Sequence, residues 1–165
     1  MIEIMQSIRP EWCKKDFSGE KTVEFRKTRP KANPPYQVFV YETANGGGSG
    51  LVIGEYICDE VAKIGIDGVG PYLMNDGEAH YLPEIGWKTG MVNARRELIE
   101  YSGVFGVFTK LYGWHITRTV LYGIPKELSD FKHYEASGRG FFVPLERAPQ
   151  SWCYVKGGWT NDHTD

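Results

Sequence analysis

The sequence predicts a single α+β domain in which a small, closed or nearly closed β-sheet carries a few short helices. The length of 165 residues suits one domain, and 41% hydrophobic residues are enough to bury a core. Twenty glycines and 9 prolines favour many turns between short strands. Several segments alternate between apolar and polar residues, as β-strands do. One helical segment lies near the start of the chain and another lies within an irregular stretch.

A short helix is expected over residues 9–19. Pro10 suits the first turn of a helix because an N–H there has no intrahelical partner, and Gly19 suits a left-handed end. The side chains expected to face inward are those of Trp12, Cys13 and Phe17.

The next segment, residues 22–27, alternates as a strand does. Val23 and Phe25 fall on one face of such a strand. The other face carries the polar side chains of Thr22, Glu24 and Arg26. The pattern therefore predicts one polar surface backed by an apolar one.

Two further strands with a tight connection follow. Residues 36–43 and 51–58 are rich in aromatic and β-branched side chains, and a glycine-rich stretch over 45–50 lies between them. This stretch lacks the Gly-Lys-Ser/Thr ending of a phosphate-binding loop, and no helical pattern follows it directly. We interpret it as the loop of a β-hairpin.

The middle of the chain is less regular. Residues 67–90 show no sustained period and are interpreted as an insertion. Asn93 can cap a helix over 94–101 that Gly103 closes. Two more strands are expected, over 113–122 and 151–155. The domain organisation that follows is one domain over residues 1–156, an insertion around 64–110 and a loose tail over 157–165.

Composition limits the class of protein further. The formal net charge of −2 excludes the bulk positive field of a nucleic-acid packager, so a site for a polyanion must be a local patch. The 3 cysteines are far apart and form no Cys-x-x-Cys pair, so we expect neither a disulfide framework nor a zinc knuckle. No metal and no cofactor are expected. No segment has the pattern of a membrane span or a secretory leader, and a cytoplasmic location is expected.

Residues 18–26, Ser-Gly-Glu-Lys-Thr-Val-Glu-Phe-Arg, match the Gly-x-Lys-x-x-Glu-x-Arg signature of the ASCH domain, a relative of the PUA-like RNA-binding barrels. Further segments resemble blocks of short bacterial and prophage ASCH proteins: residues 8–13, 26–31, 52–59, 112–116 and 149–154. The resemblance implies a small curled β-barrel with flanking short helices and a cleft beside the signature strand. It also implies a role in handling RNA or modified nucleosides.

One branch of this family resembles an amidohydrolase that removes the acetyl group from N4-acetylcytidine with a lysine, a threonine and a glutamate. Lys21 matches the lysine, Glu24 stands in the place of the threonine, and Glu55 is a match for the glutamate. A threonine hydroxyl can act as a nucleophile, whereas a carboxylate works as a base or a nucleophile by different chemistry. The hydrolase activity therefore does not carry over directly. Some relatives have a cysteine-rich insertion near residues 131–149, and this chain has no cysteine there, so no zinc is expected.

The signature residues predict a cationic cleft with an embedded carboxylate. Lys21, Arg26 and Arg29 can hold a phosphate, and Glu24 can accept a hydrogen bond from the exocyclic amine of a base. Two further ligand contacts are considered, a stacking platform at Trp114 and a polar contact at Ser151. For Trp114 the alternative is core packing, and for the Glu24 and Arg26 pair it is an ordinary surface ion pair worth about 0 to 1 kcal/mol.

The sequence thus predicts a module that binds RNA or a modified nucleotide. The alternative is a metal-independent hydrolase of a modified nucleoside, or a ribonuclease. In that case Glu24 or Glu55 would activate water while Lys21 stabilised the oxyanion. A Lys21 with a lowered pKa, which would take the proton itself, is a further alternative.

Overall fold

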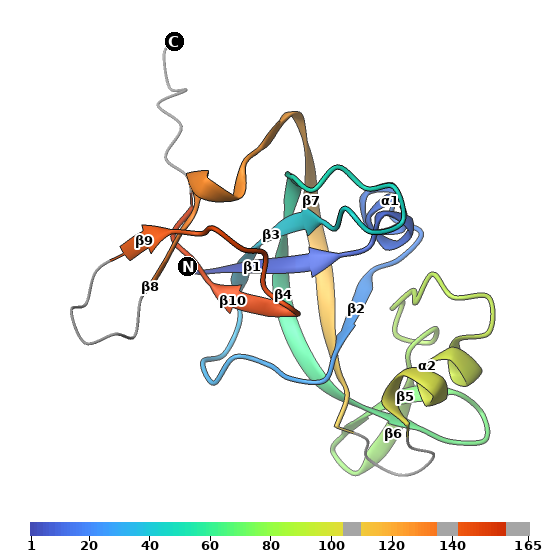
Figure 1. The fold of residues 1–165 in the computed structure, drawn as a ribbon. Coiled ribbons are helices and arrows are strands. Elements are labelled where there is room, and N and C mark those ends of the chain that lie inside the picture. The colour runs from blue at the N-terminus through green and yellow to red at the C-terminus, as the bar shows by residue number, and fades with distance from the viewer. Residues whose placement is uncertain (104–109, 135–141, 158–165) are drawn as a thin grey trace. The chain divides into compact units, whose positions relative to one another are not determined.

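The structure of the chain, a computed structural model, describes residues 1–103, 110–134 and 142–157. Its elements in chain order are β1 (Ile2–Ile8), α1 (Pro10–Ser18), β2 (Val23–Arg26), β3 (Tyr36–Glu42), β4 (Val52–Ile66), β5 (Pro71–Asn75), β6 (Glu78–Tyr81), α2 (Ala94–Ser102), β7 (Tyr112–Lys126), the 3-10 helix η1 (Leu128–Asp130), β8 (Lys132–Tyr134), β9 (Phe142–Pro144) and β10 (Trp152–Tyr154) (Figure 1). Strands dominate and the helices are short, which confirms the α+β class. Within the described ranges no helix is long and apolar enough to cross a membrane.

One mixed sheet joins most of the strands. Its order is β10-β1-β3-β4-β5-β6, and β7 pairs with both β2 and β4. The parallel pair β1 and β3 is in register from Ile2 opposite Tyr36 to Ile8 opposite Glu42. The antiparallel pair β2 and β7 places Glu24 opposite Trp114. A separate two-stranded sheet is formed by β8 and β9.

The chain divides into two compact units, which are described separately. The terminal unit comprises Met1–Cys13, Tyr36–Tyr56 and Val120–Asp165. Its core includes the buried side chains of Met5, Phe39, Val52, Phe131, Leu145 and Val155. The central unit comprises Lys14–Pro35 and Ile57–Thr119. Its core is formed by Val23, Phe25, Ile64, Ile66, Leu82, Trp87, Leu98 and Leu111.

The first helix and the strand after it lie close to where the sequence predicts them. α1 ends at Ser18, and Gly19 has the expected left-handed φ of +75°. Cys13 is buried as expected. Trp12 and Phe17 are only half-buried, and Asp16 is the other fully buried residue of the helix. The side chains of β2 alternate as predicted, but the face that carries Glu24 is buried and not exposed to solvent. Glu24 on that face is only 6% exposed.

The predicted hairpin of β3 and β4 is confirmed, and β4 continues to Ile66, beyond the expected end. The irregular description of residues 67–90 is wrong in part, because β5 and β6 form a second hairpin there. Asp76 and Gly77 both have positive φ, 50° and 81°, and connect the two strands. An Asp-Gly pair between strands is a strong signal for such a two-residue turn. The strand β1 was also not anticipated.

The second helix is confirmed over nearly the expected range. Gly103 ends it with φ of 67°, and its N–H donates to the Ile99 carbonyl oxygen. Asn93 occupies the N-cap position, although its side chain makes no capping hydrogen bond. The strands predicted near 113–122 and 151–155 correspond to β7 and β10. The loose tail was expected over residues 157–165, and all of it after Gly157 lies outside the described residues.

Gly113 on β7 provides a test of core packing in the central unit. A Cβ at this position would lie 2.9 Å from Val23 Cγ2, 3.0 Å from Trp87 Cζ3 and 3.1 Å from Ile64 Cδ1. We expect Gly113→Ala to lower the free energy of unfolding by about 1–3 kcal/mol, because the added methyl overpacks a closed core. Urea unfolding measures the change.

The matched control is Gly123→Ala in the same strand, where nothing lies within 4 Å of an added Cβ. This variant is expected to unfold like the wild type within about 0.5 kcal/mol. Equal stabilities of the two variants would show that the interior around Gly113 has room for a methyl group.

Candidate functional site

The candidate site is a buried group of four charged side chains in the central unit: Asp16, Lys21, Glu24 and Arg26. We call it the charged cluster. The Lys21 ammonium donates a hydrogen bond to Asp16 Oδ1 at 2.9 Å and another to Glu24 Oε2. Glu24 Oε1 lies 3.2 Å from Arg26 Nη1. Lys21 is 2% exposed and Asp16 1% exposed. With both carboxylates ionised, the cluster is electrically neutral.

The turn between α1 and β2 brings these side chains together. The helix ends at Ser18. The Lys21 N–H then donates to the Lys15 carbonyl oxygen at 3.0 Å, so the chain after the helix turns back toward its last turn. The reversal places the Lys21 side chain beside Asp16, five residues earlier. Glu24 and Arg26 then follow on one face of β2, two residues apart, as strand geometry requires.

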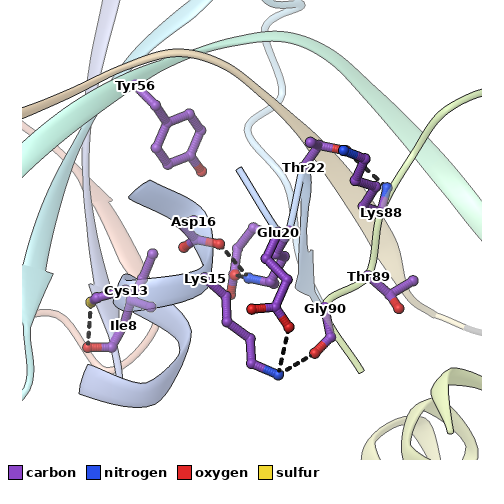
Figure 2. A network of polar contacts seen from close by, with 12 residues as sticks. Ile8, Cys13, Lys15, Asp16, Glu20, Thr22, Tyr56, Lys88, Thr89 and Gly90 are labelled. Carbon is purple, nitrogen blue, oxygen red and sulfur yellow. Dashed lines mark hydrogen bonds and ion pairs between the residues drawn. The ribbon is translucent and has the colours of Figure 1, made fainter. Parts of the chain in front are cut away.

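A short stretch of chain, residues 88–90, packs against Lys21, and we call it the covering segment. The Thr22 N–H donates to the Lys88 carbonyl oxygen at 2.7 Å, and the Lys88 N–H donates to Thr22 Oγ1 at 2.9 Å. Figure 2 shows the Lys15 ammonium between the Glu20 carboxylate, 3.4 Å away, and the carbonyl oxygen of Gly90. Together these contacts hold the covering segment in place.

Gly90 allows the covering segment to lie this close. Its φ of +67° is in the left-handed region, and a Cβ there would come within 2.9 Å of the Lys21 Cβ. A glycine is therefore required at this point, both by the backbone conformation and by the contact with Lys21.

Burial and neighbouring charges decide the protonation of the charged cluster. Burial by itself would lower the pKa of Lys21, but the nearby Glu24 and Asp16 carboxylates outweigh it and raise that pKa above its usual value. Burial by itself would raise the pKa of Glu24, yet Lys21 and Arg26 hold it below the usual value. Lys21 and Glu24 are therefore charged at neutral pH. The lowered Lys21 pKa considered for a hydrolase is wrong, because two carboxylates face the ammonium.

Asp16 differs from its neighbours in the charged cluster. Burial raises its pKa to about 7, since the attraction of Lys21 only partly offsets the loss of hydration and the nearby Glu24 carboxylate raises the pKa further. Its Oδ2 atom is buried and has no hydrogen-bond partner among the described residues. Asp16 thus combines an unpaired acceptor oxygen, as far as the described residues show, with a raised pKa.

Asp16 is the residue that the sequence interpretation missed. One signal was available, because Asp16 lies three residues after the inward-facing Cys13 and therefore on the same face of the helix. A polar residue on the buried face of a short helix requires a hydrogen-bond partner and is therefore a candidate for a functional site. That its partner is Lys21 follows only from the turn after α1.

The other residues predicted near the signature strand have different environments. Trp114 is fully buried and pairs across the strands with Glu24, which favours core packing over a stacking platform. Arg29 is exposed. The ring of His115, the neighbour of Trp114, stacks on Trp87 with centroids 4.9 Å apart, and its Nδ1 lies 2.7 Å from Asp59 Oδ1.

Glu55 and Ser151 belong to the terminal unit. Both Glu55 oxygens accept hydrogen bonds, Oε1 from Gln37 Nε2 at 3.1 Å and Oε2 from the Tyr122 hydroxyl. Ser151 is half-buried, and its carbonyl oxygen accepts the Ser7 N–H at 3.1 Å. Within the described part of the chain, no three His, Cys, Asp or Glu side chains gather in a way that could hold a metal ion.

The pH dependence of stability tests the environment of Asp16. Its carboxyl has an ordinary pKa of 3.8 and a pKa of about 7 in the folded chain. Folding therefore favours the protonated form, and this stabilisation is lost as the pH rises through about 7. We expect the stability of Asp16→Asn relative to the wild type to increase by about 3 kcal/mol between pH 5 and pH 8.

Urea unfolding of both proteins at the two pH values measures this difference. The control is Glu11→Gln, which neutralises an exposed carboxylate in the same helix. It is expected to leave the pH dependence of the wild type unchanged. Parallel profiles for Asp16→Asn and the wild type would contradict a raised Asp16 pKa.

Comparisons with known proteins relate this geometry to one fold. No family model and no curated protein sequence matches the chain. Among solved structures, the ASCH protein from Zymomonas mobilis matches with a TM-score of 0.59 and 19% identity, over 93% of this chain and 87% of that one. A tyrosine-to-phenylalanine variant of that protein matches with a TM-score of 0.60 and 18% identity, over 94% of this chain and 91% of that one. A serine-to-alanine variant gives 0.59 and 18%, over 93% and 88%.

At this level of identity, the agreement over nearly the whole chain concerns the fold. The residues of the Gly-x-Lys-x-x-Glu-x-Arg segment occupy the turn after α1 and the strand β2. The fold of the chain is therefore similar to that of the ASCH protein from Zymomonas mobilis.

Proposed function

We propose that this chain binds RNA or a nucleotide through the charged cluster and the basic residues that follow β2. The observation that carries the proposal is the clustering of Lys21, Glu24 and Arg26, the residues that the family resemblance associates with the ligand. They form one hydrogen-bonded group beside an acceptor, Asp16 Oδ2, that has no partner in the described residues. A buried polar group without a partner costs free energy and marks a place for a ligand.

In this proposal the phosphates and the base have different partners. Lys21 is neutralised by two carboxylates, and separating it from them to hold a phosphate would leave buried charges unpaired, which is costly. The phosphates are therefore assigned to the exposed cations just after β2: Lys27, Arg29 and Lys31. The polar atoms of the charged cluster are left to contact a base.

This assignment suits the charge of the whole chain. A formal net charge of −2 gives no general attraction for RNA, so affinity has to come from a few local contacts. Arg29 is exposed, and it can form a planar two-point contact with a phosphate at no cost to a buried pair.

Salt titrations of binding test the phosphate contacts. We expect Arg29→Ala to weaken binding of a single-stranded RNA oligonucleotide of mixed sequence and to reduce the slope of log affinity against log salt by about 0.7. Arg26→Ala is expected to weaken binding too, because it removes a cation next to Glu24. Fluorescence anisotropy at several salt concentrations gives both quantities.

The matched control is Arg147→Ala, an exposed arginine of the terminal unit. It removes the same charge and should keep the affinity and slope of the wild type. Wild-type affinity and slope in a folded Arg29→Ala variant would reject the proposed phosphate contacts, and wild-type affinity in a folded Arg26→Ala variant would reject the part assigned to the charged cluster.

A second candidate is a metal-independent hydrolase of a modified nucleoside, and the Asp16 environment favours it. A carboxyl with a pKa of about 7 suits a general base, and the protonated Lys21 beside it suits stabilisation of an oxyanion. Glu24 is less suited as a base, since two cations keep its pKa low. Both oxygens of Glu55 are engaged by Gln37 and Tyr122.

Turnover of N4-acetylcytidine, followed by chromatography, tests this candidate. We expect product from the wild type and none from Lys21→Ala or Asp16→Asn, because the first loses the oxyanion partner and the second loses the base. Glu55→Ala should retain activity. Absence of product at high wild-type concentration would reject this substrate, and product from folded Lys21→Ala would reject the assigned roles.

A further inference from the structure

We infer that Asp16 is the specificity-determining acceptor of the charged cluster and that it selects nucleobases carrying an exocyclic amino group. The inference rests on the proposed binding of RNA or a nucleotide. It concerns a residue outside the Gly-x-Lys-x-x-Glu-x-Arg segment.

The contacts of the two carboxylates distinguish Asp16 from Glu24. Glu24 is occupied at both oxygens, by Lys21 at Oε2 and by Arg26 at Oε1. Asp16 is occupied only at Oδ1, by Lys21 at 2.9 Å. Its Oδ2 has no partner in the described residues, although the side chain is 1% exposed. The acceptor role that the sequence suggested for Glu24 is therefore assigned to Asp16.

The chemistry of a carboxylate decides which base it prefers. An ionised carboxylate only accepts hydrogen bonds, so Oδ2 is satisfied by an N–H group and repelled by a carbonyl oxygen. Cytosine presents an amino group where uracil presents a carbonyl oxygen, and acceptance from this amino group is an established recognition contact of Asp and Glu. A buried acceptor left unpaired by the wrong base also costs affinity.

The covering segment packs beside Lys21, the hydrogen-bond partner of Asp16. Residues 88–90 pack against Lys21 and are held by the Thr22 contacts and by Lys15 at the Gly90 carbonyl oxygen (Figure 2). A base that reaches the charged cluster from this side displaces these few contacts. These contacts are hydrogen bonds from Thr22 and Lys15 to the segment and from the segment to Thr22.

Binding of such a base is linked to the proton of Asp16. The charged groups that face Asp16 are Lys21 from the turn and Glu24 and Arg26 from β2, and Tyr101 of α2 contacts Arg26. Burial raises the pKa of Asp16 to about 7, so the protonated form, which cannot accept at both oxygens, predominates below that pH. If only the ionised form binds, apparent affinity rises about tenfold from pH 6 to pH 8.

The experiment compares short RNA oligonucleotides made only of cytidine or only of uridine, without terminal phosphates, so that the ligand does not titrate in this pH range. Affinities are measured for the full wild-type chain, Asp16→Asn and Glu11→Gln at pH 6 and pH 8. Urea unfolding confirms that each variant is folded. Glu11→Gln matches the charge change on the same helix, where Glu11 is exposed.

We expect the wild type and Glu11→Gln to prefer oligocytidine by about tenfold at pH 8. In both proteins the affinity for oligocytidine should fall about tenfold at pH 6. Asp16→Asn should bind both oligonucleotides with similar affinity and without this pH dependence, because an amide can turn to offer either a donor or an acceptor.

The wild-type data test the inference even where Asp16→Asn does not fold. Equal, pH-independent binding of the two oligonucleotides by the wild type would overturn the role of Asp16 and leave the proposed RNA binding intact. A folded Asp16→Asn variant that keeps the preference and the pH dependence would also overturn it. Failure of every oligonucleotide to bind at either pH would reject the proposed function itself.

Discussion

The Lys21 ammonium forms hydrogen bonds with two buried carboxylates, one on α1 and one on β2. This arrangement fixes the end of the helix relative to the start of the strand. Each charge in it is tolerated only because the others are present, since an unpaired ion at this depth would cost several kcal/mol, in the range of about 3–5 kcal/mol. The left-handed Gly19, the reversal at Lys21 and the close approach of Gly90 all serve to bring these groups together.

The same interaction determines what the site can offer a ligand. A lysine between two carboxylates is not a free cation for a phosphate, and a glutamate between two cations is not a free base. Asp16 differs from both, because it is buried, its Oδ2 has no hydrogen-bond partner in the described ranges, and burial raises its pKa to about 7. Both proposed functions use this carboxylate, as an acceptor in one case and as a base in the other.

Glutamate at position 24 has consequences for the whole charged cluster. The sequence resemblance to ASCH proteins implies a threonine at this place in one branch of the family, and a threonine carries no charge. Here Glu24 adds a negative charge that helps keep Lys21 protonated and that raises the pKa of Asp16. The Glu24 carboxylate on β2 thus contributes to the protonation of both Lys21 and Asp16.

Local signals in the sequence were sufficient for several elements. Pro10 and Gly19 delimit α1, and the alternation of Val23 and Phe25 defines β2. Gly103 ends α2 as expected. The Asp76-Gly77 pair is a further local signal, because it marks the turn between β5 and β6. β1 lacks such a signal, because the consecutive residues Ile4, Met5 and Gln6 are all buried and the strand does not alternate between a buried and an exposed face.

For the site, the sequence by itself determined Lys21, Glu24 and Arg26 as candidates, because their spacing along one turn and one strand face is a local property. Only the tertiary structure decided that this polar face is buried, that Lys21 binds both carboxylates and that Asp16 Oδ2 has no hydrogen-bond partner among the described residues. Burial and electrostatic coupling depend on which segments pack together, here α1, the turn, β2 and residues 88–90. Those contacts between segments set the pKa of Asp16, and a pattern read along the chain contains no measure of them.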